Sequence, residues 1–264
     1  MVGVGMSIRL DRIMNRNTKR TVIVPMDHGV TMGPIEGLTR IRDTINSVVE
    51  GGANAVVLHK GVVRSGYRGY GKDVGLIIHM SGSTELADDP LRKVSVCTVE
   101  EAIKLGADGV SVHINMGGPL ESFMLQHLTD ATRSCTEWGL PLLAMMYPRG
   151  GKAKEMAPEK TIPFITRVAY ELGASIIKVP YTGDVKSFSK VVESVDVPVI
   201  IAGGSKVSTE ESLRIVKESI DAGGAGVACG RNVFQHDDPR KMVRAIARIV
   251  HENATVKEAM EELE

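Results

Sequence analysis

Eight short runs of apolar residues recur along this chain, separated by longer stretches whose apolar positions have helical spacing. Runs that are apolar throughout, rather than at every second position, are typical of parallel strands buried on both faces. The eight predicted strands are residues 21–26, 54–58, 74–79, 109–114, 141–146, 175–179, 198–202 and 225–229. A further short run at 93–97 competes with 74–79 for the third position.

Amphipathic stretches between these runs predict the helices. They are residues 38–50, 98–105, 120–138, 161–172, 185–195, 208–221 and 239–250. A glycine-containing phrase recurs where four of them end, at residues 50–55, 105–109, 172–175 and 221–225. Because glycine accepts the left-handed conformation that ends a helix, the chain can turn there directly into the next strand.

Eight strand–helix units in 264 residues predict an α/β fold, a (β/α)8 TIM barrel in a single domain covering residues 1–264. Residues 8–14 precede the first strand and are expected to form a helix that covers the barrel floor. The tail, residues 256–263, is expected to add an extra helix. The alternative is an open doubly wound sheet, which favours six strands and a GxGxxG fingerprint that Met26-Asp-His-Gly29 lacks.

Composition narrows the classes of partner. The chain has 32 basic and 32 acidic side chains, so no excess charge favours nucleic acid or an anionic membrane. No apolar run reaches the roughly 18 residues that span a bilayer, and the first residues lack the pattern of a signal peptide. Three widely spaced cysteines indicate reduced thiols in a cytoplasmic protein. A near-zero net charge also leaves self-association open.

Lys178 is the most unusual residue, because it interrupts the apolar strand Ser175-Ile-Ile-Lys-Val-Pro-Tyr181. Burial disfavours the charged ammonium form of a lysine, and a neutral amine in a pocket attacks carbonyl carbons to form a Schiff base. The structural alternative is a lysine that passes the strand end to reach solvent or a carboxylate.

Two further strand ends carry groups suited to the same chemistry. Asp27 ends the first strand in phase with Ile23, and Tyr147 ends the fifth in phase with Met145. In a TIM barrel the carboxyl ends of the strands surround the active site, so a nucleophile, a base and an acid can converge. The structural alternatives are that Asp27 caps a turn and that Tyr147 plugs the barrel rim.

Glycine-rich loops follow the seventh and eighth predicted strands. They read Ala202-Gly-Gly-Ser-Lys206 and Cys229-Gly-Arg-Asn232. These are the loops with which barrels often bind phosphate through backbone N–H groups, and Arg231 or Lys206 could add charge. The alternative is that the glycines only form tight turns.

The histidines at the strand ends suggest an alternative mechanism that depends on a metal. His59, His79 and His113 end strands two, three and four, and His28 follows Asp27, so imidazoles could hold a metal at the barrel mouth. No HxH or HExxH spacing supports this, and we favour histidines that bind substrate or orient Asp27. The loop 65–72, with Arg64, Arg68 and Lys72, is either a lid or anion clamp or a solvated loop or subunit contact.

Taken together, these motifs resemble the archaeal class I aldolase family. The matching stretches are Val24-Pro-Met-Asp-His-Gly29, Met146-Tyr-Pro-Arg-Gly-Gly151, Ile177-Lys-Val-Pro-Tyr-Thr-Gly-Asp184, Ala202-Gly-Gly-Ser-Lys206 and Val227-Ala-Cys-Gly-Arg-Asn232. The resemblance runs from about Ser7 to the end of the chain and is strongest to the branch of amino-dideoxy-heptulosonate synthases. It implies Lys178 as the Schiff-base lysine, Asp27 as proton acceptor and Tyr147 as proton donor. The substrate-binding positions that it implies are Asp27, His28, Gly29, Val30, Thr31, Tyr147, Pro148, Arg149, Lys178, Gly203, Gly204, Gly230 and Arg231.

The resemblance further implies a transaldolase-type transfer without cofactor or metal. The donor would be 6-deoxy-5-ketofructose 1-phosphate, the acceptor L-aspartate semialdehyde and the released product hydroxypyruvaldehyde phosphate, on a route to 3-dehydroquinate and aromatic amino acids. It also implies a homo-oligomer, with a decamer among the expected forms. The alternatives are a class I fructose-bisphosphate aldolase, a metal-dependent lyase, and a non-catalytic sensor of a phosphorylated ligand that would not need Lys178.

Overall fold

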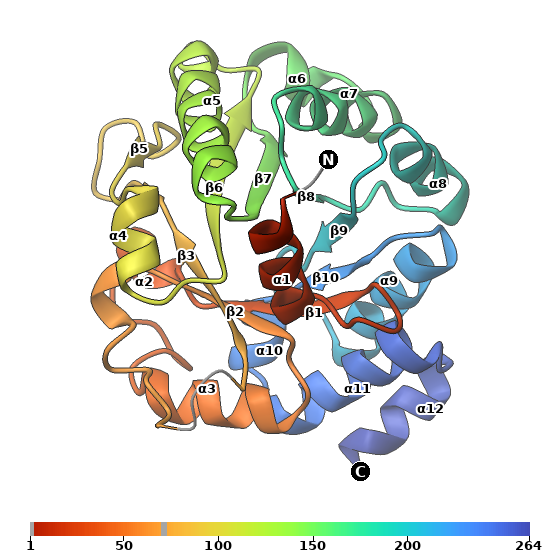
Figure 1. Ribbon diagram of the computed structural model, residues 1–264. Coiled ribbons are helices and arrows are strands. Elements are labelled where there is room, and N and C mark those ends of the chain that lie inside the picture. The colour runs from red at the N-terminus through yellow and green to blue at the C-terminus, as the bar shows by residue number, and fades with distance from the viewer. Residues whose placement is uncertain (1–2, 70–72) are drawn as a thin grey trace.

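Eight parallel strands close into a barrel in the computed structural model, which describes residues 3–69 and 73–264 (Figure 1). The strands are β1 (Thr21–Pro25), β2 (Ala55–Leu58), β3 (Gly75–His79), β6 (Gly109–Met116), β7 (Leu142–Pro148), β8 (Ile176–Val179), β9 (Val199–Ala202) and β10 (Gly226–Ala228). Around the ring they follow the order β1-β10-β9-β8-β7-β6-β3-β2. The predicted TIM barrel is confirmed, and the open doubly wound sheet is excluded.

A ring of helices surrounds the barrel, as Figure 1 shows. The long ones are α3 (Ile41–Glu50), α4 (Val99–Lys104), α5 (Glu121–Trp138), α7 (Pro158–Glu171), α8 (Val185–Glu193), α9 (Thr209–Asp221) and α11 (Pro239–Glu252). Short helices α2 (His28–Met32), α6 (Gly151–Glu155) and α10 (Arg231–Phe234) follow β1, β7 and β10. In the described part of the connection after β2 there is only a single 3-10 turn, η1 (Lys60–Val62), so the second unit differs from the repeat.

The recurring glycine phrases act as the sequence predicts. Gly52, Gly106, Gly173 and Gly223 directly follow helices α3, α4, α7 and α9, and each has a φ between 83° and 100°. Side chains with a Cβ rarely adopt this conformation, so glycine permits the sharp return into β2, β6, β8 and β10.

Alternation along the strands divides the core into two layers. Ile23, Val57, Ile77, Met145 and Ile176 point into the barrel and pack together with Ile200 and Ala228. Their neighbours in sequence face outward and pack under the helices, as do Val22, Val56, Ile78, Ile177 and Ile201. Both faces of each strand are therefore buried, which explains why the strand sequences are apolar throughout.

The first helix, α1 (Val4–Ile13), lies across the amino-terminal end of the barrel (Figure 1). Ile13 belongs to the interior cluster, and its carbonyl accepts a hydrogen bond of 2.6 Å from the hydroxyl of Thr21. Arg12 on the same helix forms an ion pair of 3.1 Å with Asp108, just before β6. The helix expected to cover the barrel floor is thus present, and it leaves the opposite end open.

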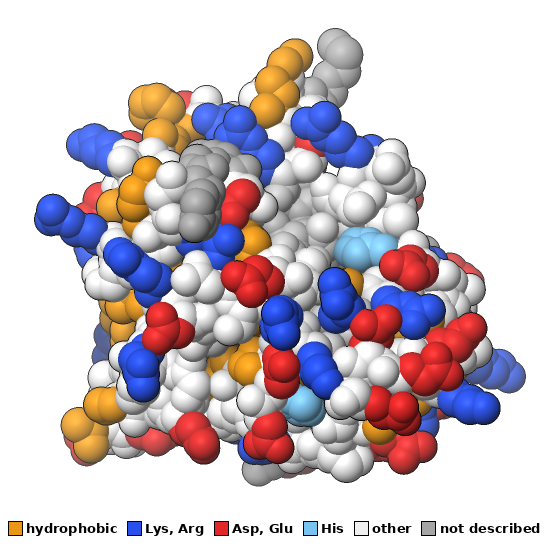
Figure 2. Space-filling view, turned by 90° about the horizontal axis from the view of Figure 1, so that it is seen from below, with side chains coloured by type: hydrophobic (Ala, Val, Ile, Leu, Met, Phe, Trp, Pro, Cys, Tyr) orange, Lys and Arg blue, Asp and Glu red, His pale blue; other side chains and the backbone are white. Residues whose placement is uncertain are grey.

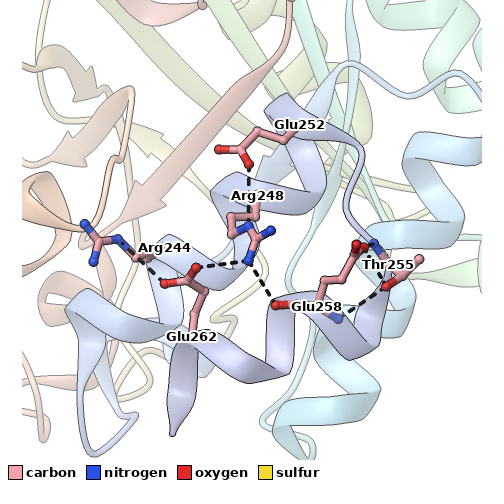
Figure 3. Close-up of polar contacts among 6 residues, drawn as sticks. All are labelled: Arg244, Arg248, Glu252, Thr255, Glu258 and Glu262. Carbon is pink, nitrogen blue, oxygen red and sulfur yellow. Dashed lines mark hydrogen bonds and ion pairs between the residues drawn. The ribbon is translucent and has the colours of Figure 1, made fainter.

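The chain ends in α12 (Val256–Met260) and the 3-10 turn η2 (Glu261–Leu263), which are fastened to α11 (Figure 3). Arg248 on α11 pairs with Glu262 at 3.1 Å and donates a hydrogen bond to the carbonyl of Glu258. Thr255 and Glu258 form a reciprocal capping box at the start of α12. A short helix therefore lies in the tail where the sequence predicts one.

The run at 93–97 does not replace the third barrel strand. Instead β4 (Ser81–Gly82) and β5 (Val94–Ser95) form a small antiparallel pair beyond the end of β3. This hairpin lies outside the barrel ring, next to the carboxyl end of β3.

The surface matches the balanced composition. Acidic and basic side chains are interspersed on the face shown in Figure 2. Within the described residues, none of the helices is long and apolar enough to cross a membrane.

Candidate active site

A cavity of about 780 Å³ opens at the carboxyl ends of the strands. Its wall contains eleven of the thirteen residues that the sequence assigns to substrate binding or catalysis. These are Asp27, His28, Thr31, Tyr147, Pro148, Arg149, Lys178, Gly203, Gly204, Gly230 and Arg231. Gly29 and Val30 lie on α2 beside them but do not line the cavity, and their role in binding stays a prediction.

Lys178 occupies the inner face of β8, two residues after Ile176 of the barrel interior. It pairs in register with Met145 on β7 and Ile200 on β9, and only 6% of its surface is exposed. Its side chain lines the cavity, so the interior alternation of the strand carries the amine into the mouth rather than among the helices. The alternative of a lysine that reaches out to solvent does not fit this burial.

Asp27 follows β1 and faces a group of histidines. Its carboxylate oxygens lie 3.6 Å from Nε2 of His79 and 3.7 Å from Nδ1 of His28. Burial by itself would raise the pKa of Asp27, but His79, His28 and Lys178 together lower it below its ordinary value. The side chain is therefore a carboxylate at neutral pH and is available as a proton acceptor.

His79 lies beside Asp27. Burial lowers the pKa of His79 to about 4, although the neighbouring carboxylate of Asp27 acts in the opposite direction. The imidazole is therefore neutral at pH 7, and its Nδ1 lies 2.8 Å from the hydroxyl of Ser111. If Ser111 donates to Nδ1, the Nε2–H group faces Asp27. His59 packs edge-on against His79, with 5.2 Å between the ring centroids.

Tyr147 ends β7 beside a second set of polar groups. Its ring centroid lies 4.7 Å from that of His113 and 5.1 Å from the guanidinium carbon of Arg149. Burial, followed by the positive charge of Lys93, lowers the pKa of His113 well below its ordinary value. His113 also contacts the amide oxygen of Asn115 through Nε2 at 2.9 Å. The phenol of Tyr147 thus lines the cavity between fixed neighbours.

Gly203, Gly204 and Gly230 form the wall next to Lys178, and side-chain hydrogen bonds join the two loops that carry them. The amide nitrogen of Asn232 donates to the carbonyls of Gly203 (2.7 Å) and Ser205 (3.0 Å). Space there is very restricted. A Cβ on Gly203 would lie 2.6 Å from the sulfur of Cys229, and one on Gly230 would lie 2.7 Å from the ring of His28.

The charged side chains of these loops separate in the structure. Arg231 lines the cavity and donates a hydrogen bond of 3.1 Å to the carbonyl of Gly204. Lys206 turns away and donates to the carbonyl of Gln235 instead. A close backbone approach with one adjacent cation is the arrangement that suits a phosphate.

The loop at residues 65–72 does not line the cavity in its described part. Arg68 forms an ion pair of 2.9 Å with Asp73 and contacts Asn46 on α3, and Arg64 is exposed without lining the cavity. Lys72 lies outside the described residues. The structure gives no support to Arg64 or Arg68 as an anion clamp, and it fits the alternative of a solvated loop or contact surface.

The strand-end histidines surround Asp27 and Tyr147. In the part of the chain that the structure describes, there is no group of three His, Cys, Asp or Glu side chains placed to hold a metal ion. That these histidines bind substrate or orient Asp27 stays a prediction.

Sequence reasoning missed Lys93, which lines the cavity wall opposite the glycine loops. It stands on the excursion between β3 and β6, one residue before β5. The short apolar run that includes Lys93 is visible in the sequence, but nothing in the sequence indicates that this residue lines the cavity.

Comparison with known proteins places these features in a family. A model of the DeoC/LacD family aldolases matches residues 21–236. The chain is 45% identical over 258 residues to 2-amino-3,7-dideoxy-D-threo-hept-6-ulosonate synthase 1 of Archaeoglobus fulgidus, covering 98% of this chain and 95% of that protein. It is 36% identical over 250 residues to 2-amino-4,5-dihydroxy-6-oxo-7-(phosphonooxy)heptanoate synthase of Streptomyces griseus, covering 94% and 91%.

A solved structure agrees with the fold over nearly the whole length. An archaeal fructose-1,6-bisphosphate aldolase, with its catalytic lysine covalently bound to the carbinolamine intermediate of the substrate, superposes with a TM-score of 0.83. The two sequences are 33% identical, and the match covers 93% of this chain and 99% of that one.

Proposed function

This chain belongs to the DeoC/LacD family of aldolases, and we propose that it is a 2-amino-3,7-dideoxy-D-threo-hept-6-ulosonate synthase that works through a Schiff base on Lys178. The observation that carries the proposal is the buried lysine on β8, which shares one cavity with Asp27 and Tyr147. A binding protein has no need for an amine, a carboxylate and a phenol around one space.

The names of the relatives define a common half of the product. Both products carry an amino acid at carbons 1 and 2 and a ketone at carbon 6. Breaking the bond between carbons 4 and 5 of either one gives L-aspartate semialdehyde and a three-carbon ketone. The products differ at carbon 7, which is a methyl group in one and carries a phosphate in the other. L-aspartate semialdehyde is thus the acceptor that suits this chain.

The reaction begins when the ε-amine of Lys178 attacks carbon 5 of 6-deoxy-5-ketofructose 1-phosphate and water leaves. Cleavage between carbons 3 and 4 puts the bonding electrons into an enamine, because the protonated imine accepts them. The hydroxyl on carbon 3 gives its proton to Asp27, and hydroxypyruvaldehyde phosphate departs. The enamine then adds to the aldehyde of L-aspartate semialdehyde, and water releases the product from the lysine.

Asp27 and Tyr147 supply the proton transfers in this scheme. Asp27 is held as a carboxylate and accepts the hydroxyl proton on cleavage, then returns it to the alkoxide when the acceptor adds. Tyr147 donates a proton to the oxygen that leaves as water during imine formation. General acid–base steps of this kind contribute about 10²- to 10⁴-fold in typical enzymes.

A second candidate, cleavage of fructose 1,6-bisphosphate, is favoured by the glycine loops. β9 is the ring neighbour of β8, so Gly203 and Gly204 lie next to Lys178 and suit a phosphate close to the imine carbon. Fructose 1,6-bisphosphate has a phosphate at that place, as does the product named for the Streptomyces griseus relative. This candidate uses the same lysine.

Borohydride trapping tests the shared mechanism. We expect reduction in the presence of the keto sugar phosphate to add the mass of the substrate fragment to Lys178. The Lys178→Met variant should show neither trapping nor turnover, and EDTA should leave the wild-type rate unchanged. Residual turnover by Lys178→Met, or loss of wild-type activity in EDTA, would contradict the proposal.

A comparison of substrates separates the two candidates. Turnover of L-aspartate semialdehyde with the keto sugar phosphate should exceed cleavage of fructose 1,6-bisphosphate in kcat/KM. The reverse order would assign the chain to the aldolases. The proposal also includes a cytoplasmic homo-oligomer on a route to aromatic amino acids, and light scattering of the purified protein tests the assembly, including a decamer.

A further inference from the structure

Lys93 is the one lysine besides Lys178 that lines the described cavity, and the mechanism above does not use it. It comes from the hairpin β4–β5 rather than from a barrel strand. Its ammonium donates a hydrogen bond of 2.5 Å to the hydroxyl of Ser83, which holds the side chain toward the mouth.

Lys93 has a second cation as its neighbour. Arg149 lines the same cavity as Lys93. Burial, and then the positive charge of Arg149, lower the pKa of Lys93. Among the described residues, neither Lys93 nor Arg149 forms an ion pair with a carboxylate. Asp27 is the acidic group that raises the pKa of Lys93, and its effect is smaller than the opposite effect of Arg149. Two neighbouring cations without a carboxylate partner favour an anionic ligand.

The position of this pair relative to the glycine loops is set by the barrel. Val94, next to Lys93, pairs with Gly82 of β4, and Ser81 of β4 accepts a hydrogen bond from the backbone of His113 on β6. Lys93 therefore lies on the side of β3 and β6, and β3 stands four strands from β9 in the ring of eight, directly across it. Lys178 lies on β8 beside the glycine loops. A substrate bound to Lys178 therefore has the glycine loops on one side of its imine carbon and the pair Lys93–Arg149 on the other.

We propose that Lys93, together with Arg149, binds the anionic end of the aldehyde half of the substrates: the carboxylate of the arriving amino-acid aldehyde and the phosphate of the departing aldehyde. This rests on the proposed function, because the aldehyde half is defined by that reaction. Both aldehydes occupy the same space in turn, since each is joined to the same carbon of the enamine.

The assignment explains why one cavity needs two anion sites. In 6-deoxy-5-ketofructose 1-phosphate the phosphate lies four carbons from the carbon that forms the imine, on the side of the bond that breaks. It therefore points away from the glycine loops. The carboxylate of L-aspartate semialdehyde lies on the same side after the new bond forms, so a single cationic pair serves both steps.

The test measures the dependence on the acceptor with hydroxyacetone as donor, which removes the departing phosphate from the assay. For Lys93→Met we expect kcat/KM for L-aspartate semialdehyde to fall about 10- to 100-fold, mainly through KM, as for the loss of a charge-assisted hydrogen bond. With propanal, an acceptor without a carboxylate, the variant should match the wild type. Lys93→Arg should recover most of the loss. Lys60→Met is the matched control, because Lys60 pairs with Glu101 outside the cavity.

Each outcome decides the matter. An unchanged KM for L-aspartate semialdehyde in Lys93→Met, or an equal loss with propanal, would overturn the inference while leaving the proposed function in place. A wild-type protein that does not use L-aspartate semialdehyde would overturn the proposed function. Binding of L-homoserine, the alcohol that corresponds to this aldehyde, then decides the anion site by calorimetry: weaker binding to Lys93→Met supports it, and equal or absent binding overturns it.

Discussion

Acid should destabilise this protein through His79 well above the pH at which carboxylates titrate. The residue is 4% exposed, and burial lowers its pKa from 6.5 to about 4. Between these two pH values the unfolded chain binds a proton at this histidine and the folded chain does not. The contribution of His79 to the free energy of unfolding is therefore complete above pH 6.5 and is lost as the pH falls toward 4.

The size of the effect follows from the shift. One pKa unit corresponds to 1.36 kcal/mol, so His79 alone removes about 3 kcal/mol of unfolding free energy across this window. That is a large part of the 5–15 kcal/mol that stabilises a typical domain. Asp27 does not contribute in the same pH window. Its pKa in the folded protein is lowered, so its contribution to stability is lost only as the pH falls below the ordinary pKa of aspartate.

Urea unfolding of wild type and His79→Gln at pH 7.0 and pH 4.5 measures this contribution. Other groups titrate in both proteins, so the difference between the two pH dependences isolates His79. We expect the wild type to lose about 2–3 kcal/mol more than the variant. Ser111→Ala is the control, because it removes the hydrogen bond to Nδ1 of His79 but keeps the imidazole. It should keep most of the change in unfolding free energy between pH 7.0 and pH 4.5. Equal slopes for wild type and His79→Gln would refute the reasoning.

Three further predictions concern the barrel and its mouth. Asp27→Asn should lower kcat about 10²- to 10⁴-fold, because the proton acceptor is lost. Borohydride should still trap hydroxyacetone on Lys178 in this variant, and full activity would show that Asp27 is not the base. Gly203→Ala brings a Cβ to 2.6 Å from the sulfur of Cys229 and so should displace the glycine loop. The concentration of dihydroxyacetone phosphate that gives half-maximal borohydride trapping should then rise at least tenfold, whereas the corresponding concentration of hydroxyacetone, which has no phosphate, should change little. Gly226→Ala should lower the free energy of unfolding in urea by more than about 3 kcal/mol, since its φ is 134° and its Cβ would lie 1.9 Å from the carbonyl oxygen of Thr21. Gly223→Ala also has a positive φ, but its Cβ would meet Val192 only at an ordinary contact of 3.6 Å, so it should cost only about 1–2 kcal/mol.

The fold was readable from the sequence because burial on both faces makes each barrel strand apolar throughout. The same alternation placed Lys178 inward, in phase with Ile176, and Tyr147 in phase with Met145. Their roles in the reaction remain predictions until the variants are measured. The glycine phrases located the helix ends for a local reason, since the left-handed conformation depends on the residue itself.

What the sequence could not show depends on contacts between distant segments. Arg68 reads as an anion clamp in a glycine-rich loop, yet Asp73 and Asn46 hold it on the outer side of the barrel. Lys93 reads as the start of a short strand, and only the hairpin's path over β3 brings it to the cavity. Neither outcome follows from local propensity, because both are set by where a loop packs.

The amide of Asn232, which holds the carbonyls of Gly203 and Ser205, makes the two glycine loops one mechanical unit. Any change that displaces one loop is transmitted to the other through that side chain, so this wall of the cavity has little freedom to adapt to a new donor. The hairpin wall is also tied to a barrel strand, because Asn115 on β6 donates to the carbonyl of Leu91 at 2.8 Å and Ser81 accepts from the backbone N–H of His113 at 2.9 Å. The side chain of Lys93 takes no part in these links, since its bond to Ser83 lies within the hairpin itself. Diversification of acceptor choice among relatives of this chain is therefore expected to proceed through the side chain at position 93, with the donor side held constant.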